Sequence, residues 1–352
     1  CEKFSIFHKK QTLLNSYKRR WLRCPLNPLN HPFRQTLHPK ISLLVTSYNF
    51  EKYIGRAVES LLAQDCRHAF EVIVVDDCSK DRTAEVMATF SDPRLRYIRN
   101  ETNRGACQSA NIAFQYARGE YIARLDGDDV WYPWFLSETA AVLDERPEVG
   151  LVYGDIHTID QDDKVDEGAS IERPALPQQG NEFVPLLHRH YICAPTMLAR
   201  RSLWEAVLPY PETLKTGLAD WLLTLKMAQQ ANFCYVPRPV AMYRVHGGGM
   251  HQSFVRDRTG ERAMRTVLDE FLGNGAARDV SKQEARKIYG NHYRRFGNSY
   301  FGEGMSADAR RCYGLALRYD PAHLLDPKFA FPLFGSWLGN GLYEQVKQVF
   351  NR

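Results

Sequence analysis

The stretch Tyr121-Ile122-Ala123-Arg124-Leu125-Asp126-Gly127-Asp128-Asp129 decides how the rest of the chain is interpreted. Its first half is mainly apolar and its second half carries three carboxylates around one glycine, which predicts a buried strand ending in dense negative charge. Asp126 and Asp128 lie two residues apart and on extended chain point to the same side. Such a pair can hold a hard divalent cation that takes phosphate oxygens as further ligands. Taken alone, the stretch fits an acidic surface turn better than a metal site.

The composition is that of an ordinary soluble protein with a sizeable core. The chain has 352 residues, of which 44% are hydrophobic and 25% charged, and this length predicts about two domains. The cysteines form no Cys-x-x-Cys pair, which argues against a zinc ribbon or disulfide framework and favours a reducing compartment. The sequence shows neither a membrane span nor a secretory signal. We therefore expect a cytoplasmic protein. The alternative is a peripheral protein at the inner face of the membrane.

The first 39 residues form a basic arm and linker. Residues 1–40 carry nine lysines and arginines against the single acid Glu2, with aromatic residues interleaved. An arm of this kind either lies on an anionic membrane surface or remains a solvated extension. No nucleic acid is expected as a partner.

Residues 41–125 alternate between short apolar runs and stretches with helical spacing. Strands are predicted at 41–45, 72–75, 95–98 and 121–125, and helices at 53–62, 83–90 and 105–119, with Asp81 capping the second helix. This alternation predicts right-handed βαβ units and an α/β fold with a mainly parallel sheet covered on both faces.

Three of these strands end in polar residues, at 46–49, 76–77 and 126–129. Because ligands of such sheets lie beyond the carboxyl ends of the strands, we expect the three ends to form one crevice. The sequence has no Gly-x-Gly-x-x-Gly after the first strand and no P-loop motif, so dinucleotide-binding and P-loop proteins lose their main support.

Five motifs in order give the chain a family resemblance. They are Val45-Thr46-Ser47-Tyr48-Asn49, Val75-Asp76-Asp77-Cys78-Ser79, Asn103-Arg104-Gly105, Gly119-Glu120-Tyr121-Ile122 and Leu125-Asp126-Gly127-Asp128-Asp129. Over about residues 40 to 250 the chain resembles the family 2 inverting glycosyltransferases with the Rossmann-like GT-A fold. The resemblance implies transfer of a sugar from a nucleotide sugar, most often a UDP-sugar, to a saccharide or lipid-linked acceptor in polysaccharide or glycoconjugate synthesis. It also implies Mg²⁺ or Mn²⁺ on the diphosphate.

The resemblance assigns roles to individual residues. It places five side chains at the nucleotide sugar: Thr46, Tyr48, Asp77, Arg104 and Asp126. Thr46 and Tyr48 would lie beside the uracil, and Asp77 would accept a hydrogen bond from the base. In the Asp-x-Asp motif, Asp128 would ligate the metal ion, with Asp126 near the ribose or the ion.

The second half of the chain supplies the candidate base. A helix at 135–143 and a strand at 149–153 precede a predicted flexible loop at 160–182. Inversion by single displacement needs a carboxylate that takes the proton of the acceptor hydroxyl. The family keeps a pair of acids on a segment like 217–221; here Ala219 replaces the first acid and only Asp220 matches. A helix N-cap is the competing role for Asp220.

His246 lies in a Tyr-Arg-x-His segment similar to the one that closes these sites. It is a candidate ligand of the metal or the diphosphate, with a structural histidine as the alternative. The chain's other histidines, including His188 and His190, receive no role.

The remainder is predicted to be helical, so the expected division is an arm at 1–39, a GT-A domain at 40–255 and a helical extension at 256–352. Residues 309–321 resemble the second helix of a tetratricopeptide unit, which cannot bury its own apolar face and should pack on the catalytic domain or a partner. Residues 329–342 are aromatic but too short to span a bilayer, so peripheral membrane contact is expected instead.

Two other functions remain open on the sequence. A non-catalytic scaffold protein of a polysaccharide-assembly complex is favoured only by the acid missing at Ala219. A sugar nucleotidyltransferase would share the sheet and the metal, but it should carry a Gly-rich, Lys- or Arg-containing loop after the first strand, where Thr46-Ser47-Tyr48-Asn49 stands.

Overall fold

The computed structural model describes residues 38–168, 179–210, 218–246, 254–273 and 280–338. The chain divides into a unit of residues 1–37, which lies outside the described residues, and a second unit of residues 38–352. The basic arm and the end of the aromatic stretch at 329–342 therefore fall wholly or partly outside the described residues.

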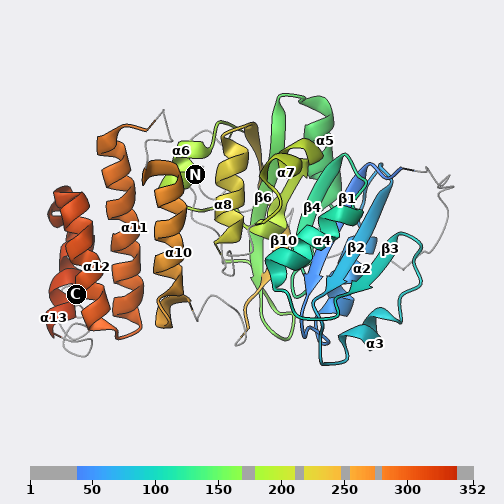
Figure 1. Ribbon diagram of the computed structural model, residues 1–352, viewed down its shortest axis with the longest axis horizontal. Coiled ribbons are helices and arrows are strands. Elements are labelled where there is room, and N and C mark those ends of the chain that lie inside the picture. Colours follow the sequence, from blue (N-terminus) through green and yellow to red (C-terminus); the bar gives the residue numbers. More distant parts are fainter. Residues whose placement is uncertain (1–37, 169–178, 211–217, 247–253, 274–279, 339–352) are drawn as a thin grey trace, which may run out of the picture. The chain divides into compact units, whose positions relative to one another are not determined.

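The second unit is built on one mixed sheet (Figure 1). Its main strands are β1 (Ile41–Ser47), β2 (Phe70–Asp76), β3 (Leu95–Arg99), β4 (Tyr121–Asp126), β5 (Val130–Trp131), β6 (Val149–Ile159), β9 (Met197–Arg200) and β10 (Asn232–Arg244). They lie in the order β3-β2-β1-β4-β9-β6-β10-β5. The pairs β1–β2, β1–β4, β2–β3 and β6–β10 are parallel, whereas β9 runs antiparallel to β4 and β6. The predicted α/β fold with a mostly parallel sheet is confirmed.

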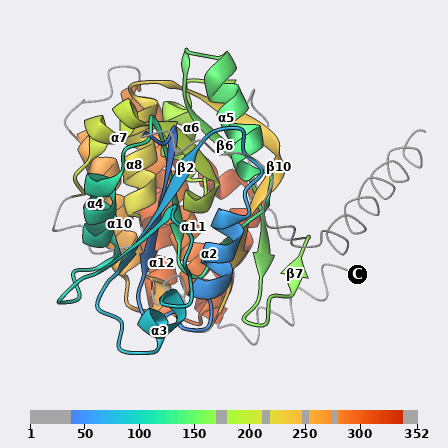
Figure 2. The same ribbon diagram turned by 90° about the vertical axis from the view of Figure 1, so that its right-hand side faces the viewer.

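The central strands are buried on both faces, as their continuous apolar sequences require. Every residue of β1 and β2 is buried. Alternate residues of β1 enter two different cores: Leu44 packs with the helices of one face, and Leu43 and Val45 pack with those of the other. Figure 2 shows α4, α7 and α8 on one side of the sheet and α2 and α5 on the other.

The covering helices have the following bounds: α2 Ile54–Leu62, α3 Thr83–Met87, α4 Ala106–Tyr116, α5 Phe135–Glu145, α6 Phe183–His188, α7 Arg201–Val207 and α8 Ala219–Ala228. Helix α3 ends earlier than predicted, and its N-cap position is Arg82 rather than Asp81. Asp81 nevertheless accepts a hydrogen bond from Thr83 N at 3.0 Å. It therefore pairs one of the backbone N–H groups at the start of the helix, although it lies one residue before the N-cap.

The region after α5 is more regular than the sequence predicted. Strand β6 continues to Ile159 because β10 pairs with it along most of its length. The predicted loop at 160–182 contains the short strands β7 (Val165–Asp166), which pairs with β6, and β8 (Gln179–Gly180), which pairs with β10. The prediction of a flexible loop over the whole range is therefore wrong where β7 and β8 stand. Residues 169–178 lie outside the described residues.

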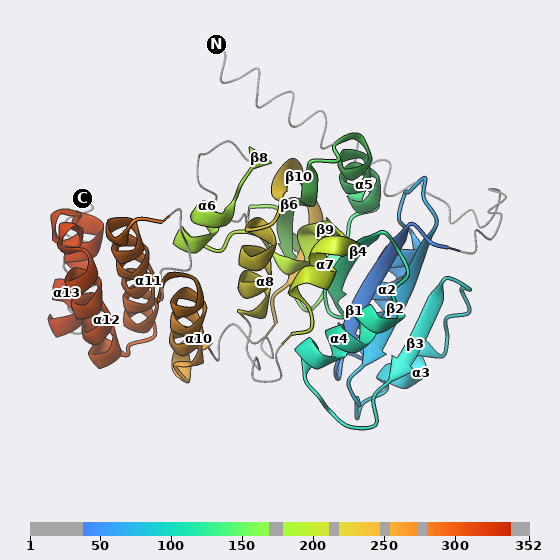
Figure 3. The same cartoon turned by 45° about the horizontal axis from the view of Figure 1, so that its top comes forward.

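The C-terminal segment forms helices α10 (Thr259–Leu268), α11 (Lys282–Gly302), α12 (Ser306–Tyr319) and α13 (Pro327–Leu338) (Figure 3). Helices α11 and α12 pack so closely that a Cβ at Gly297 would lie 2.5 Å from the ring of Tyr313. His292 of α11 contacts the carbonyl of Leu187 at 2.8 Å, and its ring lies 5.0 Å from that of Trp221 in α8. Helix α11 thus packs on α6 and α8, whereas α12, which contains most of residues 309–321, packs on α11 and α13 within the C-terminal segment.

In the described part of the chain, no helix is both long enough and apolar enough to cross a bilayer.

Candidate functional site

The polar ends of β1, β2 and β4 meet at one edge of the sheet. Thr46 stands opposite Asp126 in the strand register, and Ser47 stands opposite Asp76. The turn after β4 is tied to β1 by a hydrogen bond from Gly127 N to Thr46 O at 2.9 Å, and Asp77 N bonds Ser47 O at 2.8 Å. The predicted convergence of the three strand ends is confirmed.

Asp77 holds the loop that leads into α4. Its Oδ1 accepts hydrogen bonds from Asn100 Nδ2 at 2.9 Å and Arg104 N at 2.8 Å, and its Oδ2 accepts one from Gly105 N at 2.7 Å. Gly105 has a φ of +86°, a conformation that favours glycine. These hydrogen bonds use most of the roughly four acceptor positions of a carboxylate, and Asp77 itself is buried. The Arg104 side chain is exposed.

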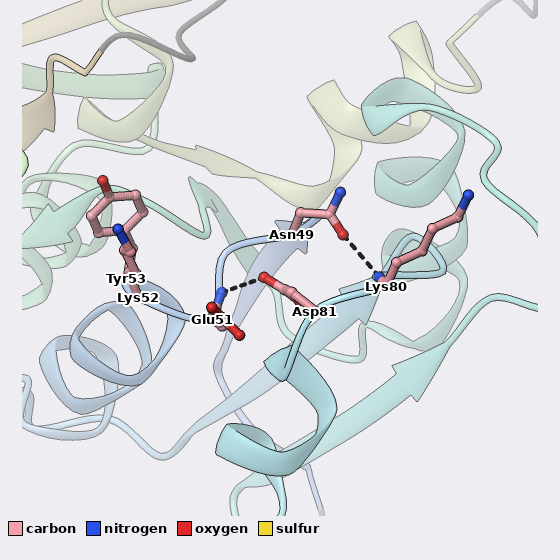
Figure 4. A pocket seen from close by; sticks show the side chains of 6 residues that line it. All are labelled: Asn49, Glu51, Lys52, Tyr53, Lys80 and Asp81. Carbon is pink, nitrogen blue, oxygen red and sulfur yellow. Dashed lines mark hydrogen bonds between the residues drawn. The ribbon is translucent and has the colours of Figure 1, made fainter.

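The loops after β1 and β2 are fastened to each other (Figure 4). Asn49 Oδ1 accepts a hydrogen bond from Lys80 N at 2.8 Å, and Asp81 Oδ2 accepts one from Glu51 N at 2.9 Å. An open cavity of about 410 Å³ lies between them, lined by Asn49, Glu51, Lys52, Tyr53, Lys80 and Asp81. Tyr48 lies on the same loop and is 39% exposed, so its ring is accessible to a ligand.

The first aspartate of the motif is held from two sides. Thr46 Oγ1 donates to Asp126 Oδ1 at 3.1 Å, and Arg124 Nη2 donates to both carboxylate oxygens of Asp126, at 2.9 and 3.2 Å. Thr46 itself is buried. The structure therefore places Thr46 near the end of β1, two residues before Tyr48, with its hydroxyl on Asp126 of the neighbouring strand β4.

The second aspartate meets the histidine that follows β10. His246 Nε2 lies 3.1 Å from Asp128 Oδ2, although the two residues are far apart in the sequence. The His246 ring also packs against Tyr53, with ring centroids 5.4 Å apart. Asp128 and His246, two candidate metal ligands predicted from different motifs, are thus adjacent.

The three carboxylates of this turn oppose one another's ionisation. Burial, and then the charge of Asp126, raises the pKa of Asp128, while His246 acts in the other direction. Burial and the charges of Asp128 and Asp126 raise the pKa of Asp129 well above its usual range. A cation at this turn would remove the repulsion, which is the electrostatic condition that a divalent metal ion meets.

The residues present fit such an ion. Asp129 Oδ1 accepts a hydrogen bond from Arg244 N at 2.8 Å, but its Oδ2 is buried without a hydrogen-bond partner among the described residues. No group of three or more His, Cys, Asp or Glu side chains in the described ranges forms a complete metal site. An incomplete set of protein ligands suits Mg²⁺ or Mn²⁺, which share their coordination with phosphate oxygens and water.

Arg244, which was assigned no role from its sequence position, joins β10 to this turn. Its side chain is 1% exposed and donates to Asp128 O at 2.7 Å, Asp160 O at 2.6 Å and Asp163 Oδ1 at 2.6 Å. Its guanidinium also lies 4.5 Å from the centroid of the Tyr53 ring. Arg244 therefore fixes the backbone on both sides of the Asp128–His246 pair. The sequence signal that could have identified Arg244 was its position two residues before His246.

Asp220 lies in the first turn of α8, whose N-cap position is Leu218. The N-cap role considered for Asp220 is therefore wrong. One carboxylate oxygen accepts a hydrogen bond from Trp221 N at 2.8 Å, and the side chain is 26% exposed. The carboxylate is thus held at the start of a buried helix and still open to a substrate.

Arg124 connects the two groups of acids. Its side chain is 11% exposed. Burial lowers the pKa of Arg124, but the negative charges around it, first Asp126 and among the others Asp220, raise it overall. The same guanidinium hydrogen-bonds the Tyr210 side chain. Sequence reasoning missed Arg124 because an arginine inside a strand carries no motif of its own.

Comparison with known proteins agrees with this geometry. The family model named Glycosyl transferase family 2 matches residues 42–208. An uncharacterized glycosyltransferase of Nostoc sp. is 28% identical over 258 residues, covering 69% of this chain and 80% of that protein. The poly(ribitol-phosphate) beta-N-acetylglucosaminyltransferase TarS of Staphylococcus aureus is 31% identical over 241 residues, covering 66% of this chain and 40% of TarS.

Solved structures give the same fold. The crystal structure of S. aureus TarS 1–349 superposes with a TM-score of 0.57 at 22% identity, covering 81% of this chain and 82% of the other. Structures of this TarS fragment with UDP and with UDP-GlcNAc superpose with TM-scores of 0.51 and 0.53. These structures show that the fold is of the GT-A type. The chain belongs to glycosyl transferase family 2, as the resemblance predicted.

Proposed function

We propose that the protein is a metal-dependent inverting glycosyltransferase that moves a sugar from a UDP-sugar to the hydroxyl of a saccharide or lipid-linked acceptor. One observation carries the proposal: Arg124 hydrogen-bonds Asp126 and lies within electrostatic reach of Asp220. This interaction supports a single site for the donor-side carboxylates and the candidate base. UDP as the nucleotide is supported by the TarS structures, which contain UDP and UDP-GlcNAc.

On this proposal the nucleotide lies between the loops that follow β1 and β2. Asp77 accepts a hydrogen bond from the base N–H, Tyr48 offers an exposed ring, and Arg104 is positioned by its backbone at the mouth of α4. Asp128 and His246 hold the Mg²⁺ or Mn²⁺ ion, with Asp126 as the second carboxylate. The ion supplies charge stabilisation to the leaving diphosphate; opposite unit charges 4 Å apart at an effective dielectric of 20 gain about 4 kcal/mol.

Asp220 acts as the general base. As the acceptor oxygen forms its bond to the anomeric carbon, the carboxylate of Asp220 takes the hydroxyl proton, and the sugar–phosphate bond breaks with its electron pair on the diphosphate. Attack from the face opposite the leaving group inverts the anomeric centre. A non-catalytic scaffold protein of a polysaccharide-assembly complex would need no general base, so the two functions differ in their dependence on Asp220.

The variant Asp220→Asn tests this assignment. We expect it to bind UDP with the affinity of the wild type and to lose transfer by a factor of about 10² to 10⁴, the usual share of a general base. Binding is measured by thermal shift with UDP, GDP and UDP-sugars, with and without Mn²⁺, and transfer by release of UDP. Glu205→Gln, an exposed carboxylate on α7, is the matched control.

Each competing function has its own signature in these assays. Wild-type transfer by Asp220→Asn would remove Asp220 as the base, and the absence of a UDP-dependent shift would remove the donor assignment. Pyrophosphate formed from UTP and a sugar phosphate would favour the nucleotidyltransferase, and donor binding without UDP release under any acceptor would favour the scaffold. Cytoplasmic location and peripheral membrane contact stay predictions from the sequence.

A further inference from the structure

A histidine that carried no sequence signal lies beside the proposed base. His190 follows helix α6, and its Nδ1 is 4.0 Å from Asp220 Oδ2. Its ring is stacked on the indole of Trp221, with centroids 6.4 Å apart and planes at 29°. The His190 side chain is 21% exposed. A titratable group from the α6 segment therefore stands next to the carboxylate on α8.

The hydrogen bonding of the His190 ring is incomplete among the described residues. Its Nε2 is buried and has no hydrogen-bond partner within the described ranges. Leaving a buried polar atom unpaired is unfavourable, so a position of this kind calls for an explanation. Stacking on Trp221 would be served equally well by an apolar ring, which has no such cost. Packing alone therefore does not account for an imidazole here.

The electrostatic surroundings keep the imidazole neutral at neutral pH. Burial lowers the pKa of His190 from its ordinary value of 6.5, and the charge of Asp220 and the carbonyl of Ile192 act against that shift. Among the described residues, Asp220 is the only charged group that affects this pKa. Asp220 also interacts electrostatically with Arg124, Cys107 and Tyr210, from β4, α4 and the segment before residue 211.

We propose that His190 is the proton-accepting partner of Asp220, so that the two side chains act together as the base. The acceptor O–H bond breaks as its oxygen bonds the anomeric carbon, and the proton passes to Asp220 and from Asp220 to His190 Nδ1. The electron pair of the sugar–phosphate bond leaves with the diphosphate, and the imidazolium returns its proton to solvent after product release. No further reactant is needed.

The chemical reason is the mismatch between a lone carboxylate and neutral pH. An ordinary aspartate, with a pKa of about 3.9, is a weak base at pH 7, whereas the pKa of an imidazole lies much nearer the working pH. The separation of 4.0 Å exceeds a hydrogen bond and is short enough for one rotation or one water to bridge it. Catalytic hydrogen bonds are often long in ligand-free structures and tighten with substrate.

This inference rests on the proposed function, and its decisive readout is a pH profile. In the wild type, kcat/KM falls on the acid side as His190 becomes protonated. In His190→Gln we expect the acid limb to move to lower pH, toward the carboxylate, and the plateau to drop about 10- to 100-fold while the UDP affinity is unchanged. His188→Gln is the control, because His188 pairs with Glu284 at 2.6 Å and not with the base.

A second measurement does not depend on transfer. The imidazole of His190 is titrated by NMR in the wild type and in Asp220→Asn; loss of the carboxylate charge lowers the pKa of His190 if the two groups interact. An unchanged acid limb in His190→Gln, or an unchanged His190 pKa in Asp220→Asn, overturns the inference. If the wild type transfers no sugar, the proposed function fails, and the titration still decides whether the pair exists. Should His190→Gln fold poorly, His190→Asn is measured in its place.

Discussion

Arg124 is the residue on which the two halves of the site depend. Its Nη2 donates two hydrogen bonds to Asp126, and its charge offsets acids on both β4 and α8. An arginine is suited to this position because its planar guanidinium binds a carboxylate through parallel hydrogen bonds and stays charged when buried. A lysine has the same charge without the planar geometry.

We predict that Arg124→Met weakens both folding and donor binding. The unfolding free energy should fall by about 2 kcal/mol, less than the 3–5 kcal/mol of a fully buried pair, because the Asp126 side chain is 32% exposed. The uncompensated carboxylate repels the diphosphate, so the Kd for UDP should rise about tenfold, equivalent to 1.4 kcal/mol. Urea unfolding and UDP titration measure the two effects. Arg124→Lys should recover part of the affinity; equal UDP affinity in Arg124→Met and wild type would contradict the role.

At this scale the sequence predicted only residues that carry motifs. Asp126, Asp128 and His246 were found because each lies at the end of a recognisable strand or segment. Arg244 and His190 were not, because their partners are distant: Arg244 reaches Asp163, 81 positions away, and His190 reaches Asp220 on another helix. Side-chain chemistry at such positions is decided by tertiary contacts, which have no local pattern.

Among the elements, the turn between α4 and β4 is the most tightly constrained. A Cβ at Gly119 would lie 2.5 Å from Ser42 N and 2.6 Å from Ile41 C, both backbone atoms of the central strand β1. Gly119 N also donates to Ser42 Oγ at 2.8 Å. Backbone atoms of a buried strand cannot move aside as a flexible side chain can, so only glycine permits this approach.

We predict that Gly119→Ala lowers the unfolding free energy by about 3 kcal/mol, at the upper end of ordinary overpacking, because the clash is with backbone. Gly314→Ala is the matched control: it lies on an exposed face of α12 with nothing within 4 Å of the added Cβ, and it should raise stability by about 0.5–1 kcal/mol. Denaturant unfolding of the two variants checks the pair. Equal effects of the two substitutions would show that the close approach at Gly119 is relieved elsewhere.

Element types were predicted best where burial is local and complete. The strands at 41–45, 72–75, 95–98 and 121–125 were each found because an uninterrupted or alternating apolar run fits a buried strand. The length of β6 and the antiparallel insertion of β9 were not predictable, because both follow from pairing with strands distant in the sequence. The same pairing replaced part of the expected loop at 160–182 with β7 and β8.

For the molecule as a whole, the junction between α11 and the sheet region contains a buried histidine. The Nε2 of His292 contacts Leu187 O at 2.8 Å, and burial lowers the pKa of His292 to about 3. The unfolded chain therefore takes up a proton on this histidine near pH 6.5, whereas the folded protein does not until about pH 3.

We predict that stability falls as the pH drops below 6.5. In this window the unfolded state binds one proton more than the folded state, so the unfolding free energy decreases by up to about 1.4 kcal/mol per pH unit from this group. Urea unfolding at pH 7.5, 6 and 5 measures the slope. His292→Gln should reduce the slope by the equivalent of one proton, and a slope identical to that of the wild type would assign the acid sensitivity to other groups.

Trp221 links the C-terminal helices to α8, the helix that carries Asp220. The centroid of its indole lies 6.4 Å from that of the His190 imidazole and 5.0 Å from that of His292 in α11. Residues of α10 and α11 share a single apolar core with Trp221. Loss or exchange of the C-terminal segment during evolution would expose apolar residues of α8, the helix that carries Asp220. Such a change would therefore require new residues to cover that helix.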